Sequence, residues 1–213
     1  MNEKLKDYLT DTLPLQADWV VKLEEMALAE NVPIMDKAGI NLVMQLIRIS
    51  RPHRILEIGT AIGYSALRML EAAPDASIVT IEKDEHRYAQ AMEHIRELNK
   101  EQQIEVIYGD ALDKLQQLSE NGSTFDLLFI DAAKGQYQRF FELAEPMLNP
   151  NGMIISDNVL FRGFVANPED VPKRYTKMVE KIRSYNQMLM SHPDFTTSII
   201  PIGDGVAVSY KKS

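Results

Sequence analysis

Residues 54–65, which read RILEIGTAIGYS, contain a short apolar run followed by two glycines at positions 59 and 63. The run predicts a β-strand over 54–58, and the next helix is expected to begin near Tyr64. Glycine permits the backbone angles of a sharp turn and lets a ligand approach the backbone closely. We therefore expect Gly59 and Gly63 to connect the first strand and helix of an α/β sheet, with a ligand at the turn.

The same alternation of strand-like and helix-like segments continues along the chain. Apolar runs predict strands at 54–58, 78–81, 104–108, 127–130, 153–156, 198–201 and 206–209. Amphipathic segments between the first five runs predict helices, and a long helix is expected to end near Met190. Gly203-Asp204-Gly205 reads as a hairpin turn between the last two runs. This order predicts a doubly wound, mostly parallel α/β sheet with an antiparallel hairpin at one edge.

Two stretches before the first strand have apolar residues at helical spacing. They are Trp19, Leu23, Met26 and Ala27, and then Ile40, Val43, Met44 and Ile47, with Pro33 between them. A chain of 213 residues that is 45% hydrophobic is expected to fold as one domain. We predict a single domain over 1–213, with a helical part at 1–50 and an α/β core at 51–213.

The composition excludes several classes of protein. The absence of cysteine rules out disulfides, thiolate metal sites and a cysteine nucleophile. No apolar run approaches the roughly 20 residues that cross a bilayer, so we expect a cytoplasmic protein without membrane contact. A net charge of -8 argues against a surface that is basic throughout. Any nucleic-acid partner would need a local basic patch.

Polar residues follow the first three predicted strands where a nucleotide-like cofactor would bind. Glu82 ends the second strand, where an acid usually takes ribose hydroxyls, and Asp110-Ala111 ends the third, where an adenine edge would lie. Ala61 stands where a dinucleotide site has its middle glycine, so a cofactor without pyrophosphate fits better. An alternative is that these residues form a tight turn and solvated strand ends.

The first turn also offers groups for an amino acid. Free N–H groups at the helix start near Tyr64-Ser65 could hold a carboxylate, and Glu57 could accept a hydrogen bond from an ammonium group. Ribose, adenine, carboxylate and ammonium together describe S-adenosylmethionine. We expect Glu57, Gly59, Gly63, Tyr64, Ser65, Glu82, Asp110 and Ala111 to bind it.

Oxygen ligands follow two later strands. Asp131 ends the run at 127–130, and Asp157 and Asn158 end the run at 153–156. Because the carboxyl ends of parallel strands share one edge, these side chains can converge on Mg²⁺ or another divalent cation such as Mn²⁺. Such an ion would orient a hydroxyl and lower its pKa, and Lys134 could take the proton. The alternative for Asp157 and Asn158 is an ordinary turn after a strand. The alternative for Lys134 is a solvated lysine near a helix start.

With these residues in place, the chain resembles the cation-dependent class I O-methyltransferases, which include catechol and caffeoyl-coenzyme A methyltransferases. The matching residues are Glu57-Ile58-Gly59, Gly63-Tyr64-Ser65, Glu82, Gly109-Asp110-Ala111, Asp131-Ala132-Ala133-Lys134, Asp157-Asn158 and Pro201-Ile202-Gly203-Asp204-Gly205. The resemblance implies a seven-stranded Rossmann-like sheet, S-adenosylmethionine, a metal held by Asp131, Asp157 and Asn158, Lys134 as the base, and a homodimer. Many relatives have a second acid where this chain has Ala133.

A narrower resemblance is to the bacterial tRNA 5-hydroxyuridine methyltransferases, which make 5-methoxyuridine at the wobble position. It rests on residues 32–39, 131–137 and 157–163. It implies tRNA as the partner, and it adds Met35 and Asp131 to the cofactor site. Lys173, Lys177 and Lys181 are spaced for one helical face, and with Arg162 they are predicted to contact phosphates. The alternative is a solvated helix face interrupted by Glu180.

Three other functions compete with this interpretation. A small-molecule catechol or phenolic O-methyltransferase would use the same chemistry without the basic helix. An NAD-dependent oxidoreductase would use the same sheet, but Ala61 argues against it. A non-catalytic RNA-binding protein would not need the cofactor and metal residues.

Overall fold

The computed structural model of the chain describes residues 3–212. Its strands are β1 Arg54–Ile58, β2 Ser77–Glu82, β3 Ile104–Tyr108, β4 Phe125–Ile130, β5 Leu148–Ser156, β6 Phe195–Ile200 and β7 Val206–Lys211. Its α-helices are α1 Glu3–Asp11, α2 Asp18–Ala29, α3 Lys37–Ser50, α4 Tyr64–Ala72, α5 Glu85–Glu97, α6 Ala111–Glu120, α7 Tyr137–Ala144 and α8 Thr176–Ser191. The predicted order of elements, including the N-terminal helices, is confirmed.

Within residues 3–212, the strands form one seven-stranded sheet in the order β3-β2-β1-β4-β5-β7-β6. The pairs among β1 to β5 are parallel, whereas β7 is antiparallel to both β5 and β6. The predicted doubly wound sheet with an antiparallel edge is therefore correct. Strand β5 begins at Leu148, whereas the prediction began it at residue 153. Residues 149–151 read as a turn in the sequence, but Leu148 before them already pairs with Phe125 across a bulge.

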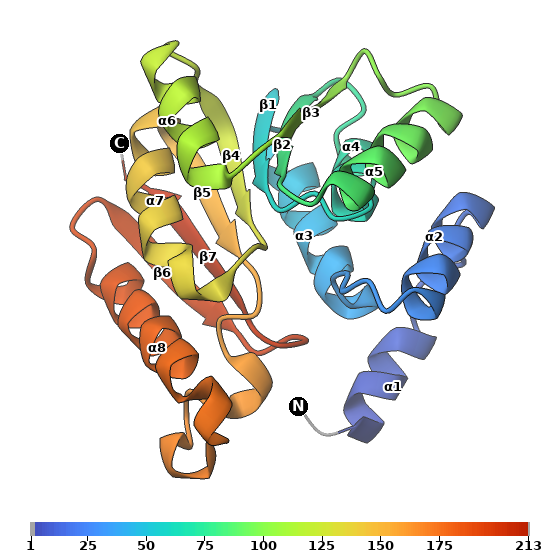
Figure 1. Cartoon of the computed structure of the whole chain (residues 1–213). Helices are drawn as coiled ribbons and strands as arrows, with labels where there is room; N and C mark the ends of the chain where they lie inside the picture. Colours follow the sequence, from blue (N-terminus) through green and yellow to red (C-terminus); the bar gives the residue numbers. More distant parts are fainter. Residues whose placement is uncertain (1–2, 213) are drawn as a thin grey trace.

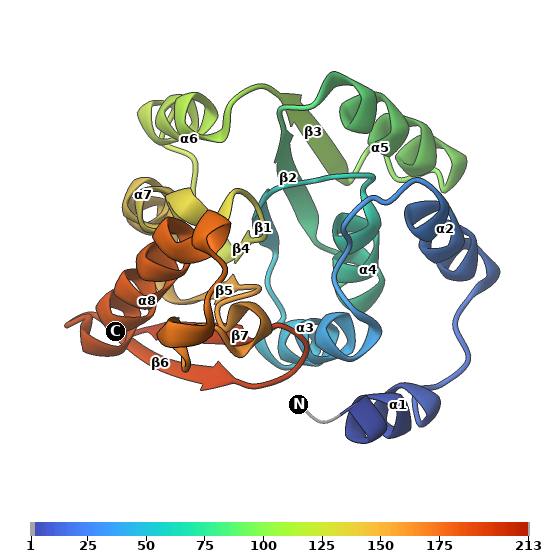
Figure 2. The same cartoon turned by 60° about the horizontal axis from the view of Figure 1, so that its bottom comes forward.

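Helices cover both faces of the sheet (Figures 1 and 2): α3, α4 and α5 lie on one face, and α6, α7 and α8 lie on the other. Neighbouring residues of a strand point to opposite faces. In β1, Ile55 packs in the core with α3 and α4, whereas Leu56 packs in the core with α7 and α8. Burial on both faces explains why the parallel strands read as continuous apolar runs.

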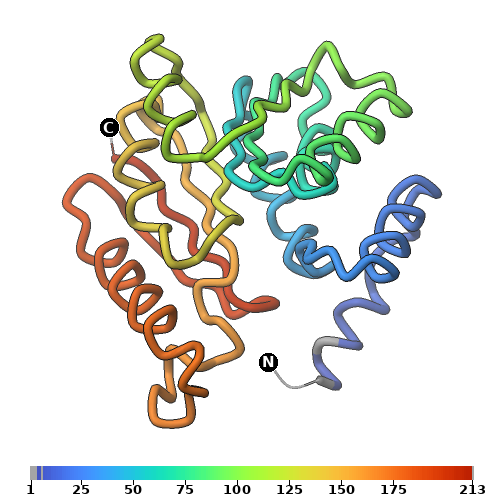
Figure 3. Tube along the Cα trace, viewed as in Figure 1, coloured from blue at the N-terminus to red at the C-terminus, as the bar shows by residue number. Residues whose placement is uncertain are grey.

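The N-terminal helices extend beyond the sheet. Helix α1 lies at the start of the trace (Figure 3) and contacts α3. Leu5 and Tyr8 on this helix are 50% and 64% exposed. No helix in the described part of the chain is long and apolar enough to cross a membrane.

The strand order reverses between β1 and β4, and this switch point brings the two turns together. Backbone hydrogen bonds continue past the strand ends, since Asp131 N–H donates to Ile58 O and Asp157 N–H donates to Ile130 O, both at 3.0 Å. Gly59 has φ +104, and a Cβ there would lie 2.1 Å from the carbonyl oxygen of Asp131. Only glycine allows so close an approach. In open α/β sheets this is the position where ligands bind.

The β6–β7 turn reaches the same end of the sheet. Asp204 O accepts hydrogen bonds from Leu160 N–H at 2.8 Å and Phe161 N–H at 3.1 Å. The turn is tight on both sides, because a Cβ at Gly203 would meet Asp36 Oδ2 and one at Gly205 would meet Leu160. The turn therefore fixes the loop that follows β5.

Candidate active site

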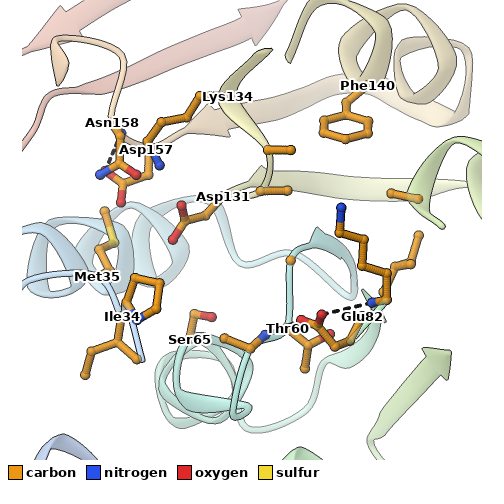
Figure 4. Close-up of a pocket in the computed structure, with 18 of the residues that line it drawn as sticks. Ile34, Met35, Thr60, Ser65, Glu82, Asp131, Lys134, Phe140, Asp157 and Asn158 are labelled. Atoms are coloured by element: carbon orange, nitrogen blue, oxygen red, sulfur yellow. Dashed lines mark hydrogen bonds between the residues drawn. The ribbon is translucent and has the colours of Figure 1, made fainter. Parts of the chain in front are cut away.

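A cavity of about 470 Å³ opens at the carboxyl ends of β1 to β5. Pockets for cofactor-sized molecules have volumes of this order. In Figure 4, Asp131, Asp157, Asn158 and Lys134 gather at one end of the cavity, while Thr60 and Glu82 lie at the other. The two ends therefore offer different chemistry: an acidic site with a lysine, and a strand-end acid beside the glycine turn.

Most of the predicted site residues line this cavity. They are Met35, Gly59, Tyr64, Ser65, Glu82, Asp110, Ala111, Asp131, Lys134, Asp157, Asn158 and Arg162. The predicted residues outside the lining are Glu57, Gly63, Lys173, Lys177 and Lys181. The structure thus brings together residues from five strand ends, but it places Glu57 and the lysines elsewhere.

The Glu82 carboxylate organises the cofactor end of the cavity. Its Oε2 accepts a hydrogen bond from Ala61 N–H at 2.8 Å, and its Oε1 accepts from Lys83 N–H at 2.9 Å and Asp84 N–H at 2.8 Å. Ala61 has a φ of 46°, in the left-handed region. Glu82 therefore holds the glycine turn in shape while it faces the cavity.

We expect Glu82→Ala to weaken S-adenosylmethionine binding, because a carboxylate that accepts two ribose hydroxyls loses two charge-assisted hydrogen bonds at once. The loss should be on the order of 1.5–3 kcal/mol or more. The exposed Glu85→Ala variant on α5 is a control. Calorimetric titration measures both, and an unchanged dissociation constant for Glu82→Ala would remove this residue from the cofactor site.

Glu57 lies one layer behind the cavity wall and is fully buried. It accepts hydrogen bonds from Ser65 Oγ and, at 2.5 Å, from Thr80 Oγ1, which lies 2.6 Å from Thr60 Oγ1. Glu57 does not line the cavity, and each of its carboxyl oxygens accepts a hydrogen bond from a hydroxyl. The direct bond from Glu57 to an ammonium group stays a prediction. The influence of Glu57 on a ligand passes through Ser65 and Thr60, which line the cavity.

Burial raises the pKa of Glu57 to about 8, although the hydrogen bonds from Ser65 and Thr80 lower it. The charges of Asp131 and Glu82 raise it further. Between its ordinary pKa of 4.5 and about 8, the folded chain binds a proton that the unfolded chain releases. This group therefore lowers the stability of the fold as pH rises through that window.

Glu57→Gln should remove this contribution. The slope of unfolding free energy against pH should become less negative by up to about 1.4 kcal/mol per pH unit between pH 5 and 8. Urea titrations at several pH values measure the slope for both proteins. Since Asp131 and Asp157 titrate in both, the difference reports Glu57, and identical slopes would show that Glu57 is charged throughout.

The acidic end of the cavity combines two carboxyl groups on adjacent strands. Burial raises the pKa of Asp131, and the positive charge of Lys134 lowers it. Burial raises the pKa of Asp157 well above its usual range, and the charge of Asp131 raises it further. Two buried, mutually repelling carboxylates are stable together only if a positive charge compensates them.

This donor set fits a divalent cation. Asp131 and Asp157 offer carboxylate oxygens, and Asn158 offers an amide oxygen, which are ligands that Mg²⁺ prefers. Asn158 adopts a φ of 56°, which asparagine tolerates, and its N–H donates to Asp157 Oδ1 at 2.7 Å. This turn points both side chains toward the same region of the cavity (Figure 4).

A second group of potential ligands lies at the opposite end of the sheet. The side chains of Glu145, His192 and Asp194 place one ligand atom each within 4.8 Å of one another. His192 Nδ1 accepts a hydrogen bond from Asp194 N–H at 3.3 Å, which disfavours Nε2 as a metal ligand in the neutral ring. This group is unrelated to the predicted metal residues.

The prediction that Lys173, Lys177 and Lys181 share one α-helical face is wrong for Lys173, whereas Lys177 and Lys181 lie four residues apart in α8. Lys173 lies in a separate 3-10 turn, Lys173–Tyr175, that begins after Pro172, and α8 starts only at Thr176. Lys181 bends back and donates to Gly135 O at 3.1 Å. Lys177 is exposed on the first turn of α8.

Sequence reasoning missed several residues of the cavity. They are Thr60, Lys83, Arg87, Gln136, Phe140 and Asp204. Lys83 follows Glu82 directly and was open to the same strand-end argument, whereas Arg87 lies in the first turn of α5. Asp204 was named in the hairpin turn and in the family resemblance but was not assigned to the site, since its approach to the cavity depends on tertiary packing.

The family model for O-methyltransferases matches residues 16–212. The chain belongs to this family. A catechol O-methyltransferase of Niastella koreensis is 28% identical, over 99% of this chain and 97% of its own length. The chain is thus an S-adenosylmethionine-dependent O-methyltransferase with a relative that is named for catechol.

Solved structures agree with this assignment. A candidate caffeoyl-CoA O-methyltransferase of Staphylococcus aureus has a TM-score of 0.91 and 38% identity, with 98% of this chain and 99% of that chain covered. An O-methyltransferase of Bacillus cereus in complex with S-adenosylhomocysteine has a TM-score of 0.86 and 27% identity, with 98% and 97% covered. The fold and family predicted from the strand-end residues are confirmed.

Proposed function

We propose that this O-methyltransferase acts in the cytoplasm on the 5-hydroxyl of 5-hydroxyuridine at the wobble position of tRNA, with S-adenosylmethionine and a divalent cation. The observation that carries this proposal is the set of cationic residues around the cavity. Lys83, Arg87 and Arg162 line it, and Lys181 lies against Gly135 beside Lys134. These positive charges stand beside five acidic residues of the same lining, Glu82, Asp110, Asp131, Asp157 and Asp204. They would suit a substrate rich in phosphates.

The loop after β5 presents part of this charge on a small apolar platform. Phe161, Val179 and Ile182 form a separate buried cluster, and Phe164, Val171 and Tyr175 pack against it. Arg174 lies over the ring of Tyr175, 4.6 Å from its centroid. Arg162 lines the cavity, and Lys173, Arg174 and Lys177 follow it in the loop and the first turn of α8, where we expect an RNA strand to pass.

The residues of the cavity account for each part of the reaction. Asp131, Asp157 and Asn158 would hold the cation, which would supply Lewis acidity that orients the acceptor and favours ionisation of its hydroxyl. Lys134 accepts the hydroxyl proton. The acceptor oxygen then bonds to the methyl carbon as the carbon–sulfur bond breaks, and the sulfonium becomes the neutral thioether of S-adenosylhomocysteine. Glu82 and the glycine turn position the methyl donor.

A small catechol or phenol is the second candidate acceptor. The names of the relatives favour it, since one is a catechol methyltransferase and another a candidate caffeoyl-CoA methyltransferase. A catechol offers two adjacent oxygens, as 5-hydroxyuracil does with its hydroxyl and C4 carbonyl. The residues at the acidic end of the cavity therefore serve both acceptors, and only the cationic surroundings distinguish them.

The deciding experiment compares the two acceptors with one purified enzyme. Methyl transfer from labelled S-adenosylmethionine is measured with tRNA that contains 5-hydroxyuridine, with the same tRNA lacking the 5-hydroxyl, and with catechol. We expect transfer only to the first tRNA, and mass spectrometry of its nucleosides should show 5-methoxyuridine. Efficient methylation of catechol with no transfer to the hydroxylated tRNA would establish the small-molecule function instead.

Replacing Lys173, Lys177 and Lys181 with glutamate should weaken tRNA binding and flatten its dependence on salt, because phosphate contacts release counterions. S-adenosylmethionine affinity should not change. A matched variant replaces Lys22, Arg48 and Arg96, which are exposed on α2, α3 and α5, with glutamate. Gel shifts at two salt concentrations measure all three proteins, and equal loss in both variants would mean that only overall charge matters.

We also propose that the chain forms a homodimer through its N-terminal arm. Leu5, Tyr8 and Leu15 are 50%, 64% and 103% exposed, which leaves an apolar strip along α1 and the segment after it. A second copy would bury this strip. Light scattering should give twice the chain mass, and Leu5→Glu with Leu15→Glu should reduce it to the mass of one chain.

A further inference from the structure

Asn186 on α8 makes a hydrogen bond to the loop that carries the acidic end of the cavity. Its Nδ2 donates to Val159 O at 2.8 Å. Val159 is fully buried and directly follows Asn158, one of the proposed ligands of the cation. Asn186 is not part of the cavity lining, so any effect on the acceptor passes through the backbone of this loop.

The amide of Asn186 is only half satisfied. Its Oδ1 is buried and has no hydrogen-bond partner within residues 3–212. An unpaired buried acceptor costs stability, and a leucine would fill a similar space without that cost. The amide is therefore explained by its donor, which faces Val159.

The loop after β5 needs such support because several of its residues have a left-handed backbone. Asn158 has a φ of 56°, Phe161 of 38° and Arg162 of 56°. Residues with a side chain keep this conformation where surrounding contacts impose it. The N–H groups of Val159, Leu160 and Phe161 donate to the β6–β7 turn. That turn holds the loop by its N–H groups, whereas α8 holds it by the carbonyl of Val159.

The held residue lies next to the proposed ligands. Val159 N–H donates to Gly205 O at 3.0 Å and its carbonyl accepts from Asn186, so the residue is fixed on both sides. Asn158, whose N–H donates to Asp157 Oδ1 at 2.7 Å, lies between this fixed residue and the end of β5. Release of Val159 would let the backbone at Asn158 relax and part its side chain from that of Asp157.

We propose that Asn186 is a positioning residue for the cation site, which holds Val159 O and thereby keeps the Asn158 side chain directed toward Asp131 and Asp157. This inference rests on the proposed use of a divalent cation. Groups behind the ligands of a metal fix their orientation, and losing one weakens metal binding by about 10- to 100-fold. Asn186 acts through the backbone, one step further from the ligands, so the lower end of this range is expected.

The test uses Mn²⁺ as the probe, with Asn186→Leu and a matched variant at the other end of β5. Asn149 Nδ2 donates to Asp126 Oδ1 at 2.8 Å, so Asn149→Leu removes the same kind of bond at the start of the strand that ends before Asp157. Electron paramagnetic resonance measures Mn²⁺ binding without substrate, and calorimetry measures S-adenosylhomocysteine binding. Asn186→Leu should weaken Mn²⁺ binding by about 10-fold and leave S-adenosylhomocysteine affinity constant. Asn149→Leu should change neither affinity.

Amide hydrogen exchange in the metal-free protein reports on the loop itself. Asn186→Leu should speed exchange at Val159 and Leu160, because a backbone that has lost a hydrogen bond opens more often. Asn149→Leu should leave exchange at these two residues unchanged. Asn186→Ala, which also lacks the donor but adds no bulk, should repeat the result of Asn186→Leu.

Unchanged Mn²⁺ affinity in both Asn186 variants would overturn the inference. An equal loss of S-adenosylhomocysteine affinity would also overturn it, because the amide would then support the whole cavity. The same holds if Asn149→Leu loses as much Mn²⁺ affinity as Asn186→Leu. If the unaltered enzyme binds no Mn²⁺, the proposed metal requirement fails, and this inference fails with it.

Discussion

Asp157→Ala is expected to abolish turnover while S-adenosylmethionine still binds. Asp157 is 3% exposed and lies beside Asp131 at the acidic end of the cavity, away from Glu82. Losing this carboxylate removes a ligand of the proposed cation, which orients the acceptor and not the adenosine. A cation contributes several kcal/mol to a transition state, so turnover should fall on the order of 10³-fold or more. Initial rates and calorimetric titration with S-adenosylmethionine measure the two effects.

Chelation of divalent ions by EDTA should lower the turnover of the unaltered enzyme as Asp157→Ala does. Adding Mg²⁺ or Mn²⁺ should restore turnover in the chelated enzyme but not in Asp157→Ala. Glu169→Ala, an exposed acid in the following loop, should keep normal turnover. Full turnover in metal-free buffer would defeat the mechanism, whereas loss of cofactor binding in Asp157→Ala would mean that this acid supports the whole cavity.

Lys134→Ala should lower turnover more than substrate affinity, because a general base acts in the transition state. The expected loss is about 10²- to 10⁴-fold in kcat. Lys134 lies in the 3-10 turn Lys134–Gln136, three residues after Asp131, and it lines the cavity. Steady-state rates over a range of pH measure the effect, and the variant should recover at high pH, where the acceptor ionises without help.

Lys134→Arg separates the base from its charge. Arginine keeps the positive charge beside Asp131 but does not give up its proton in proteins, so turnover should remain low. Lys181→Ala removes a neighbouring ammonium group that donates to Gly135 O, and it controls for loss of charge alone. A loss confined to substrate affinity in Lys134→Ala would make this lysine a residue that positions the acceptor.

The residues at the strand ends were predictable because a parallel sheet has strict geometry. Once 54–58, 127–130 and 153–156 are recognised as neighbouring strands, the residues after them must share one edge. The ladder hydrogen bonds of Asp131 and Asp157 show this regularity continuing past the strands. Each acid could therefore be assigned to the site without knowledge of any side-chain contact.

Features that depend on contacts between distant segments were not predictable in this way. The sequence does not show that Glu57 faces Ser65 and Thr80 behind the cavity wall. Nor does it show that Lys173 leaves the helix, because lysine fits a helix and a 3-10 turn equally well. These positions follow from how helices and loops pack on the sheet, which the periodicity of a single segment does not report.

The β6–β7 turn has a consequence for how the enzyme matures. Gly203 lies so close to Asp36, near the beginning of the chain, that a Cβ at this position would clash with it. A Cβ at Gly205 would clash with Leu160, beside the acidic site. During synthesis, a ribosome-bound nascent chain already contains Asp131 and Asp157 before this turn emerges. The loop after β5 is then held in place only when the last residues have been made. Premature termination before Gly203 should therefore yield a chain that carries all its catalytic acids and is still inactive.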